Sequence, residues 1–364
     1  MRTPLYQNHI RMGAHMVDFH GWDMPLYYSS IMNEHMLVRK NVGLFDVSHM
    51  GDVLIEGDDA IDFINYLIPT DISRLEDNKC VYTAFLDQDG LIIDDTIFYR
   101  LSEKKFFFVP NASTTPMVFS WINSLKQDFN VKISDLSADI ACIAVQGPLS
   151  VKIAEVLSFH MPDPFTFSFS PTHSMNGLTN SNDMIISGTG YTGERGFEII
   201  LPSQDSPDLW DKIYKIADKI GGGLCGLGAR DTLRMEKGML LSGTDFNHDR
   251  DPFECSIGFI VNNGNDFVGK NNLISRKGVD KEIFRGFILK EKSIPRSGFE
   301  IYYEGKKIGR ITSGTMSPIL NKSIGLGFIN KENAKPGSEV EIVIRDKKVQ
   351  VRARNARVLQ VISI

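Results

Sequence analysis

The chain has 364 residues, of which 42% are hydrophobic and 23% are charged, and its formal net charge is −5. This balance is typical of a soluble globular protein, and the length predicts two or three domains. Basic residues are scattered and no run of 18 apolar residues occurs, so the sequence predicts neither nucleic-acid binding nor a membrane span.

The N-terminus and the cysteines indicate a cytoplasmic protein. The opening MRTPLYQNHI has neither the apolar core of a signal peptide nor the Arg- and Ser-rich pattern of a transit peptide. The four cysteines are far apart and show no CxxC spacing, so we expect reduced, buried thiols. The eight histidines show no metal-ligand spacing, and we expect no metal site.

Helices and strands alternate irregularly over the first 240 residues. Asp58 is the expected N-cap of the second helix, and Pro148 is the expected first residue of the third. In chain order the predicted elements are a helix from Ser30 to about Gly43, a strand at Asp52–Glu56, a helix at Asp59–Leu67, strands at Val81–Leu86, Leu91–Tyr99, Lys105–Val109 and Ile140–Val145, a helix over 148–158, strands at Met184–Ser187 and Phe197–Leu201, a helix from Ser206 to Gly221, and a helix at Ala229–Lys237. This mixed order predicts an α+β fold.

The rest of the chain is predicted to be all β. Its strands are separated by Gly and Pro turns, and they are predicted at Ile283–Leu289, Phe299–Tyr303, Lys307–Thr312, Ile324–Ile329, Glu339–Ile344 and Val349–Ala353. Short strands at this spacing are typical of a small barrel or jelly roll. We expect its boundary near Val279–Lys281.

Two adjacent carboxylates interrupt the apolar strand 91-LIIDDTIFYR-100. Side chains alternate between the two faces of a strand, so Asp95 shares a face with Ile97 and Tyr99, and Asp94 lies on the other face. Both faces are mostly apolar, which predicts a buried strand. A buried carboxylate is costly unless it is paired or hydrogen-bonded, so at least one of these acids needs a specific role.

The turn cluster 87-DQDG-90 predicts a hairpin that joins this strand to the preceding one. A four-residue loop places Tyr82 opposite Asp95, and a two-residue loop places Ala84 there, on the same face as Tyr82. We therefore expect Asp95, Tyr82 and Tyr99 to line one face. A carboxylate between two phenols suits catalysis or ligand binding, and the alternative is a structural acid satisfied by backbone or hydroxyl donors.

The run 43-GLFDVSHMG-51 places Asp46, Ser48 and His49 almost side by side in the sequence. Residues this close usually cannot converge as a catalytic triad, and no GxSxG motif occurs. We interpret the run as a turn that leads into the next strand.

Two glycine-rich stretches are candidates for ligand binding. In 188-GTGYTGERGFEI-199 the backbone could approach a ligand closely, with Tyr191 and Glu198 as polar contacts, and the alternative is a loop of positive-φ glycines. In 221-GGGLCGLGARDTLRMEKG-238 Arg230 and Arg234 share a helix face. That spacing predicts an exposed, salt-bridged helix, unless the compact turn holds Arg230 inward.

Motifs spread over nearly the whole chain resemble one family. They are 16-MVDFHGWDMPLYYSSI-31 with Glu34 and His35, 43-GLFDVSHMG-51, 91-LIIDDTIFY-99, 144-AVQGP-148, 189-TGYTGERGFEI-199, 226-GLGARDTLRMEKGM-239, 266-DFVGK-270 and 309-GRITSGTMSPIL-320. Together they resemble the T-protein, the aminomethyltransferase family of the glycine cleavage system. Their number, order and spacing make the resemblance specific.

The resemblance implies three domains arranged as a cloverleaf around a central folate site. The first domain would be discontinuous and comprise residues 1–48 and 139–240. The second would comprise residues 49–138 and 241–280. The third, residues 281–364, would be the C-terminal β-barrel or jelly-roll domain.

The resemblance also implies a reaction and its partners. The methylene carbon of an aminomethyl group, carried on the lipoyl arm of H-protein, would pass to tetrahydrofolate as co-substrate. Ammonia would leave, and the products would be 5,10-methylenetetrahydrofolate and a dihydrolipoyl arm. We expect a transient complex with lipoylated H-protein and indirect links to the other glycine cleavage components.

Site residues follow from the same motifs. Asp95 matches the family's essential acid and would face N5 and N10 of the folate, where its charge can stabilise an attacking amine. Asp94, on the other face, would be structural. Glu198 matches the pterin-binding acid, and Arg230 matches a second folate contact. The positions that line the site with aromatic or thioether surface are Met50, Tyr82, Tyr99 and Tyr191.

The chain departs from the family pattern at several positions. Gly188 replaces an arginine, Phe259 a tryptophan, Ser242 a tyrosine and, after 111-NAS-113, Val118 an acid, and the K-x-P-F signature is missing from 352-RARNARVLQVISI-364. One alternative is a tetrahydrofolate-dependent demethylase of a free methylated small molecule. Another is a non-enzymatic folate-binding protein, which would carry KGC-x-x-GQE where this chain has 237-KGMLLSGTD-245.

Overall fold

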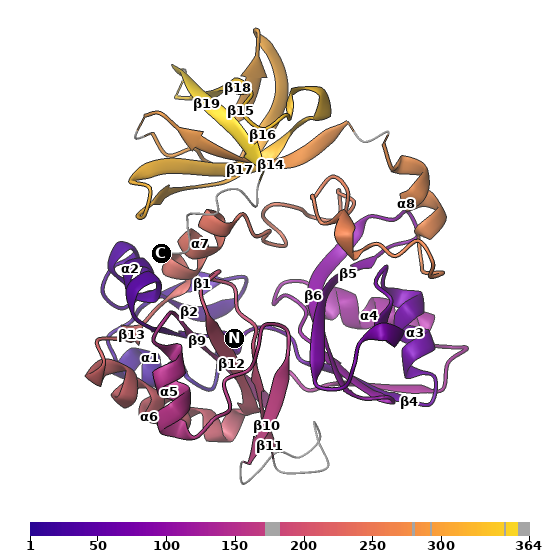
Figure 1. The fold of residues 1–364 in the computed structure, drawn as a ribbon, viewed down its shortest axis with the longest axis vertical. Helices are drawn as coiled ribbons and strands as arrows, with labels where there is room; N and C mark the ends of the chain where they lie inside the picture. The colour runs from indigo at the N-terminus through magenta and orange to yellow at the C-terminus, as the bar shows by residue number, and fades with distance from the viewer. Residues whose placement is uncertain (172–182, 279–280, 292, 346, 356–364) are drawn as a thin grey trace. The chain divides into compact units, whose positions relative to one another are not determined.

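The computed structural model describes residues 1–171, 183–278, 281–291, 293–345 and 347–355. Across these residues the chain forms two compact units (Figure 1). Unit 1 holds Met1–Phe85 and Asp94–Arg230, and unit 2 holds Leu86–Ile93 and the chain from Asp231 onward. Both units contain helices and strands, which confirms the α+β prediction. The division into three domains stays a prediction.

The first sheet of unit 1 is built around β9, a strand whose residues are all buried. Its apolar, β-branched side chains fill both faces of the sheet. The described strands, in spatial order, are β10 (Phe167–Pro171), β11 (Asp183–Ser187), β12 (Gly196–Pro202), β9 (Ile140–Gln146), β3 (Gly43–Asp46) and β13 (Gly223–Leu224). Their pairing places Glu198 of β12 between Ser187 of β11 and Ala144 of β9.

Helices pack on this sheet through apolar faces. The amphipathic α6 buries Trp210, Ile213 and Ala217 in the same core as Phe197 and Leu201 of β12. The remaining elements around the sheet are α1 (Tyr6–Arg11), the hairpin β1 (His15–Phe19) and β2 (Trp22–Tyr27), α2 (Ile31–Lys40), α5 (Ser150–Leu157), a 3-10 turn (Ser203–Asp205), α6 (Ser206–Lys219) and α7 (Leu227–Lys237), whose last residues belong to unit 2.

Two of these helices differ from the sequence prediction at their ends. Ser30 caps α2 as expected, since its Oγ accepts a hydrogen bond from Asn33 N at 3.2 Å. The helix ends at Lys40 rather than near Gly43, because the residues that follow join the sheet as β3. The predicted start of α5 at Pro148 is also wrong. Gly147 has a φ of 132°, and the helix begins two residues after the proline, at Ser150.

The second sheet of unit 1 carries the strand with the two acids. Phe85, Phe98 and Phe108 of three neighbouring strands stack in its core, with ring centroids 4.8–5.7 Å apart. The described strands, in spatial order, are β5 (Lys79–Leu86), β6 (Ile92–Ser102), β7 (Lys105–Phe108), β4 (Val53–Gly57) and β8 (Val131–Asp135), and they are accompanied by α3 (Ala60–Leu67), a 3-10 turn (Ile72–Arg74) and α4 (Thr115–Leu125).

The prediction that Asp58 caps α3 is wrong. Asp59 occupies the N-cap position, and its side chain accepts a hydrogen bond from Asn130 N at 2.7 Å rather than from the helix. Asp58 pairs with Lys104 Nζ at 2.5 Å on the surface. Both acids are therefore used in contacts with other segments.

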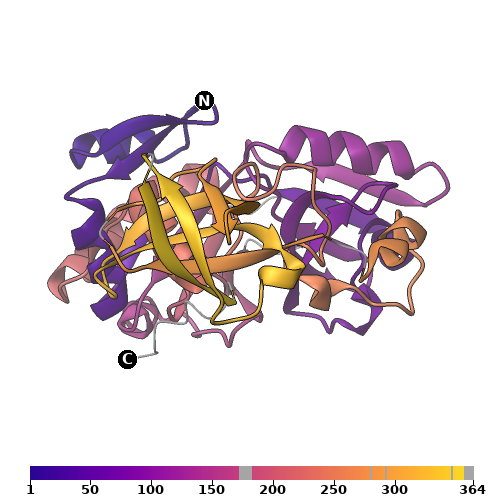
Figure 2. The same cartoon turned by 90° about the horizontal axis from the view of Figure 1, so that it is seen from above.

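The described part of the tail forms a closed barrel, as predicted. Figure 2 looks onto its strands, which are coloured orange to yellow. The strand β14 closes the barrel because it pairs with both β17 and β19. The elements of unit 2 are a 3-10 turn (Gly258–Ile260), α8 (Lys270–Arg276), β14 (Glu282–Leu289), β15 (Glu300–Tyr303), β16 (Lys306–Ser317), β17 (Lys322–Asn330), a 3-10 turn (Lys331–Asn333), β18 (Glu339–Ile344) and β19 (Lys347–Asn355). The chain end, where the family's signature is missing, lies outside the described residues.

Arg234 does not lie on an exposed helix face, so that prediction is wrong for this residue. Its side chain is only 1% exposed. The guanidinium donates to Asp245 Oδ2 at 2.6 Å, to Ser313 Oγ at 2.9 Å and to Asp231 Oδ1 at 2.8 Å. The guanidinium charge can be buried here because each of these partners accepts a hydrogen bond from it.

Candidate functional site

The acids of β6 occupy different environments. Asp94 is fully buried, and its two oxygens accept hydrogen bonds from Asn111 N and Asn111 Nδ2, both at 2.8 Å. Asp95 is only partly buried, and Oδ2 accepts a hydrogen bond from Tyr82 Oη at 2.9 Å. The hairpin therefore brings Tyr82 and Asp95 to one face, as predicted.

The surroundings of Asp95 favour its protonated form more than water does. Burial, and then the charge of Asp94, raise the pKa of Asp95 to about 7, although hydrogen bonds from Tyr82 and Asn111 act in the opposite direction. Near neutral pH both forms of the carboxyl group are populated. A group with such a pKa is suited to accept and release a proton.

Tyr99 and Glu198 are joined through Thr189. The phenol oxygen of Tyr99 lies 3.2 Å from Thr189 Oγ1, and the Thr189 hydroxyl donates to Glu198 Oε2. Ser187 lies beside them, 3.0 Å from Thr189 Oγ1. Tyr99 is on β6 and Glu198 on β12, so the contact links the two sheets of unit 1. Burial raises the pKa of Tyr99, which keeps the phenol neutral.

Arg230 is held against the glycine-rich loop after β11. Its guanidinium carbon lies 4.6 Å from the ring centroid of Tyr191, a cation–π contact. Arg230 and Glu198 also act in opposite directions on the pKa of Cys142, which burial raises, so both charges lie near the same part of β9. Arg230 is thus turned inward rather than extended into solvent.

The turn that carries Met50 sits directly beside Asn111. Gly51 N donates to Pro110 O at 3.0 Å. A Cβ on Gly51 would lie 2.3 Å from Thr115 Oγ1, so only glycine allows this close approach. Met50, which is partly buried, is placed by this turn at the start of the second sheet.

Asp46, Ser48 and His49 form no catalytic triad, as expected. Asp46 accepts hydrogen bonds from Thr3 Oγ1 at 2.6 Å and lies 2.8 Å from His9 Nε2, and Ser48 Oγ contacts the backbone of Cys142. Burial, and then the charge of Arg230, lower the pKa of His49 to about 4, so its imidazole is neutral at physiological pH. The run is a turn only in part, because Gly43–Asp46 form β3 and the residues after them make the turn that leads to β4.

The glycines of the glycine-rich loop matter more because neighbouring atoms lie too close for a side chain than because they adopt positive φ angles. Of its glycines at 188, 190 and 193, only Gly193 has a positive φ, 70°. A Cβ on Gly188 would lie 2.1 Å from Asp163 O, which excludes an arginine here without a shift of the backbone. The close packing of this loop therefore explains why position 188, an arginine in the resembled family, is a glycine in this chain.

The structure connects six of the seven predicted residues in three groups. Asp95 contacts Tyr82, Tyr99 reaches Glu198 through Thr189, and Arg230 stacks on Tyr191. Met50 is placed by its turn alone. Sequence reasoning did not single out three further residues at these contacts, which are Asn111, Thr189 and Ser187, and it set His49 aside as part of a turn. Asn111 had one available signal, since it is a polar residue two positions after the end of the predicted strand Lys105–Val109.

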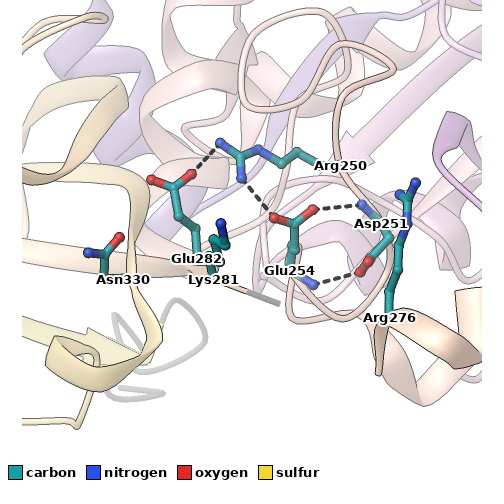
Figure 3. A pocket seen from close by; sticks show the side chains of 7 residues that line it. All are labelled: Arg250, Asp251, Glu254, Arg276, Lys281, Glu282 and Asn330. Carbon is teal, nitrogen blue, oxygen red and sulfur yellow. Dashed lines mark hydrogen bonds and ion pairs between the residues drawn. The ribbon is translucent and has the colours of Figure 1, made fainter. Parts of the chain in front are cut away.

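Unit 2 contains a separate pocket of about 460 Å³ (Figure 3). Arg250 crosses it and donates to Glu254 Oε1 at 2.9 Å and to Glu282 Oε2 at 2.6 Å. Its lining consists of Arg250, Asp251, Glu254, Arg276, Lys281, Glu282 and Asn330. The charges largely satisfy one another, and none of these residues matches a predicted site residue, so we place the candidate site in unit 1.

Metal-binding clusters and membrane-spanning helices are both absent from the part of the chain that the structure describes. No three His, Cys, Asp or Glu side chains there are grouped so that they could hold a metal ion. No helix within the described ranges is long and apolar enough to cross a membrane.

Family models match both parts of the chain. The GCVT N-terminal domain matches residues 5–264, and the glycine cleavage T-protein C-terminal barrel domain matches residues 284–358. The second match covers the barrel strands.

Curated relatives and a solved structure agree with these matches. An aminomethyltransferase from Thermotoga neapolitana is 40% identical over 326 residues, which cover 89% of this chain and 88% of the relative. One from Desulfitobacterium hafniense is 40% identical over 354 residues, or 96% of each chain. The crystal structure of glycine cleavage system aminomethyltransferase T from Bartonella henselae superposes with a TM-score of 0.90 at 28% identity, over 98% of this chain and 97% of that one.

Proposed function

Because the chain belongs to the glycine cleavage T-protein family and is an enzyme of the aminomethyltransferase type, we propose that it transfers a methylene carbon to tetrahydrofolate. The donor is an S-aminomethyl-dihydrolipoyl carrier, the H-protein of the glycine cleavage system. The C–N and C–S bonds of the donor break, so ammonia and the dihydrolipoyl thiol are released as 5,10-methylenetetrahydrofolate is formed. The observation that carries the proposal is Asp95, an acid on the motif-matched strand that is held by Tyr82 and Asn111 and partly ionised at neutral pH.

Asp95 is the catalytic residue of this proposal. Its carboxylate would stabilise positive charge on the attacking amine of tetrahydrofolate and accept the proton that the amine loses. Tyr82 fixes the orientation of the carboxylate through its 2.9 Å hydrogen bond. A pKa near 7 allows Asp95 to return the proton to the departing nitrogen, which leaves as ammonia.

Glu198 and Arg230 would hold the folate. A carboxylate accepts hydrogen bonds from the paired N–H groups at the edge of a pterin, and Thr189 already holds Glu198 in place. Arg230 can donate to carbonyl or carboxylate oxygens while it stacks on Tyr191. Met50 and Tyr99 would supply thioether and aromatic surface against the flat rings.

The carrier need only dock transiently, because a long lipoyl arm delivers the carbon. We expect a weak, salt-sensitive complex with H-protein, and no lasting contact with the other glycine cleavage components. We also expect the protein to work in the cytoplasm.

The replacement of the family's arginine by Gly188 favours a second candidate function. A side chain at position 188 would meet Asp163 O at 2.1 Å unless the backbone shifted, so this loop in its present shape cannot carry the family's usual arginine. The second candidate is a tetrahydrofolate-dependent demethylase that uses the same Asp95 on a free methylated small molecule.

The test is the reverse reaction with purified components. Wild-type protein is supplied with ammonia, 5,10-methylenetetrahydrofolate and a reduced, lipoylated H-protein, with the unlipoylated H-protein as control. We expect methylenetetrahydrofolate to be consumed only when the lipoyl arm is present. If no lipoylated carrier supports turnover but a free methylated amine is demethylated, the second candidate replaces the first.

A further inference from the structure

We propose that Asn111 is a positioning residue that holds the Asp95 carboxylate in its reactive orientation and stabilises its ionised form against the charge of Asp94. This inference rests on the proposed function, because it assigns a role to a residue that acts through Asp95.

Asn111 is shared between the two acids. Its side-chain Nδ2 lies 3.0 Å from Asp95 Oδ1 and 2.8 Å from Asp94 Oδ1, and it also lies 3.0 Å from the backbone oxygen of Asp95. Its backbone N–H donates to the other oxygen of Asp94 at 2.8 Å. One residue thus binds both oxygens of the structural acid and one oxygen of the catalytic acid.

The main chain of Asn111 is anchored on both sides. Its main-chain carbonyl oxygen accepts hydrogen bonds from the Thr114 hydroxyl at 3.1 Å and from the Thr115 hydroxyl at 2.9 Å, where α4 begins. Directly before it, Pro110 O accepts from Gly51 N at 3.0 Å, so the turn of Met50 rests on the same segment. A side chain that extends from an anchored main chain can present its donor to a carboxylate from a fixed position.

The geometry divides the two oxygens of Asp95 between two donors. Tyr82 Oη binds Oδ2, and Asn111 Nδ2 binds Oδ1. The titratable groups that act on Asp95 are Asp94 on the same strand and Tyr82 on the neighbouring one. Asp94 opposes ionisation of Asp95, and the two donors favour it. Removal of the Asn111 amide would therefore raise the pKa of Asp95 further above about 7.

The test compares wild-type protein with Asn111→Leu, which keeps a similar volume but has no N–H donor. The matched control is Asn123→Leu, because Asn123 Nδ2 donates at 2.8 Å to Phe119 O within its own helix, α4, rather than to either acid. The first readout is an infrared titration of the carboxyl groups, with the Asp95 signal assigned by its loss in Asp95→Asn. We expect the Asp95 midpoint to rise by about one pH unit in Asn111→Leu and to stay unchanged in Asn123→Leu.

The second readout is turnover against pH in the carrier assay. If the pKa of Asp95 rises from about 7 to about 8, kcat at pH 7 should fall about fivefold, because the ionised fraction falls from a half to an eleventh. The lost turnover should return at alkaline pH, and KM for tetrahydrofolate should change less than kcat. A merely structural role would lower kcat at every pH.

Unchanged titration of Asp95 in Asn111→Leu overturns the inference, whatever the activity. If Asn111→Leu does not fold, Asn111→Ala takes its place, with the same expected direction. The infrared titration requires no substrate. A wild-type protein that fails the carrier assay but shows the shifted titration would therefore refute the proposed function and leave the role of Asn111 intact.

Discussion

Two chemically identical side chains, one residue apart, have different surroundings, and this difference predicts different roles. Asp94 is fully buried and both of its oxygens are occupied by Asn111. Asp95 is partly exposed, and one donor binds each of its oxygens. The first arrangement is suited to holding a loop, and the second leaves a carboxyl group able to exchange a proton.

This difference predicts opposite outcomes for a matched pair of substitutions. Asp95→Asn keeps the shape but removes the negative charge, so turnover should fall by about 10²-fold or more while folate affinity changes little. Asp94→Asn places an amide against the donors of Asn111, so it should cost about 1–3 kcal/mol of unfolding free energy. Steady-state kinetics and thermal melting measure the two effects.

The same two variants also test whether the roles of Asp94 and Asp95 have been assigned to the correct residues. If Asp94→Asn abolishes turnover at an unchanged melting temperature while Asp95→Asn remains active, the catalytic acid is Asp94 and the roles of the two acids are reversed.

Glu198 should act on binding rather than on chemistry. Glu198→Ala removes a charged acceptor, so tetrahydrofolate affinity should weaken by about 1.5–3 kcal/mol, as for a hydrogen bond to a charged group. Calorimetry measures the affinity, and Glu155→Ala on the exposed surface of α5 is the control. Equal affinity in folded Glu198→Ala and wild type would remove Glu198 from the site.

At the scale of elements, periodic patterns were the most reliable guide. The alternation in β6 placed Asp95 and Tyr82 on one face because neighbouring strands in a hairpin share their period. Six short strands separated by turns predicted the barrel. The short helix α1 and the helix α4 were missed, because their stability comes from packing on the sheets more than from their own sequence.

The contacts of the loops could not be predicted from the sequence. Asn111 is 16 residues from Asp95, and Thr189 is 90 residues from Tyr99, yet these pairs are within hydrogen-bonding distance. No local rule reports such pairs. The first depends on how the segment after β7 folds beside β6, and the second depends on how the two sheets of unit 1 meet. The burial of Arg234 was mispredicted because two of its partners lie outside its own helix, Asp245 11 residues and Ser313 79 residues further along the chain.

Gly51 tests whether the turn of Met50 supports the site. Gly51→Ala places a methyl group against Thr115 and Pro110, so we expect a loss of about 1–3 kcal/mol in unfolding free energy and reduced turnover. Gly223→Ala is the control, because its Cβ would approach only the flexible end of Leu37, at 3.1 Å. Equal stability of the two variants, measured by denaturant unfolding, would contradict the close packing of this turn.

At the scale of the whole molecule, the family is established by matches that together cover residues 5–264 and 284–358. Motif order along the sequence was enough to recognise that family, because many weak motifs at fixed spacing are jointly specific. The three-domain division was implied by the resemblance alone and stays a prediction. All the residues predicted for the site lie in unit 1.

The proposed carbon donor is a lipoyl-bound aminomethyl group. Its identity is tested most directly by a single turnover in which H-protein carries a 13C-labelled S-aminomethyl-lipoyl arm and the protein is mixed with tetrahydrofolate. We expect the label to appear in 5,10-methylenetetrahydrofolate, with one ammonia released for each labelled product and a transfer that is slower by about 10²-fold or more in Asp95→Asn. Label that stays on the arm in the presence of folded wild-type protein and tetrahydrofolate would contradict this assignment of the donor.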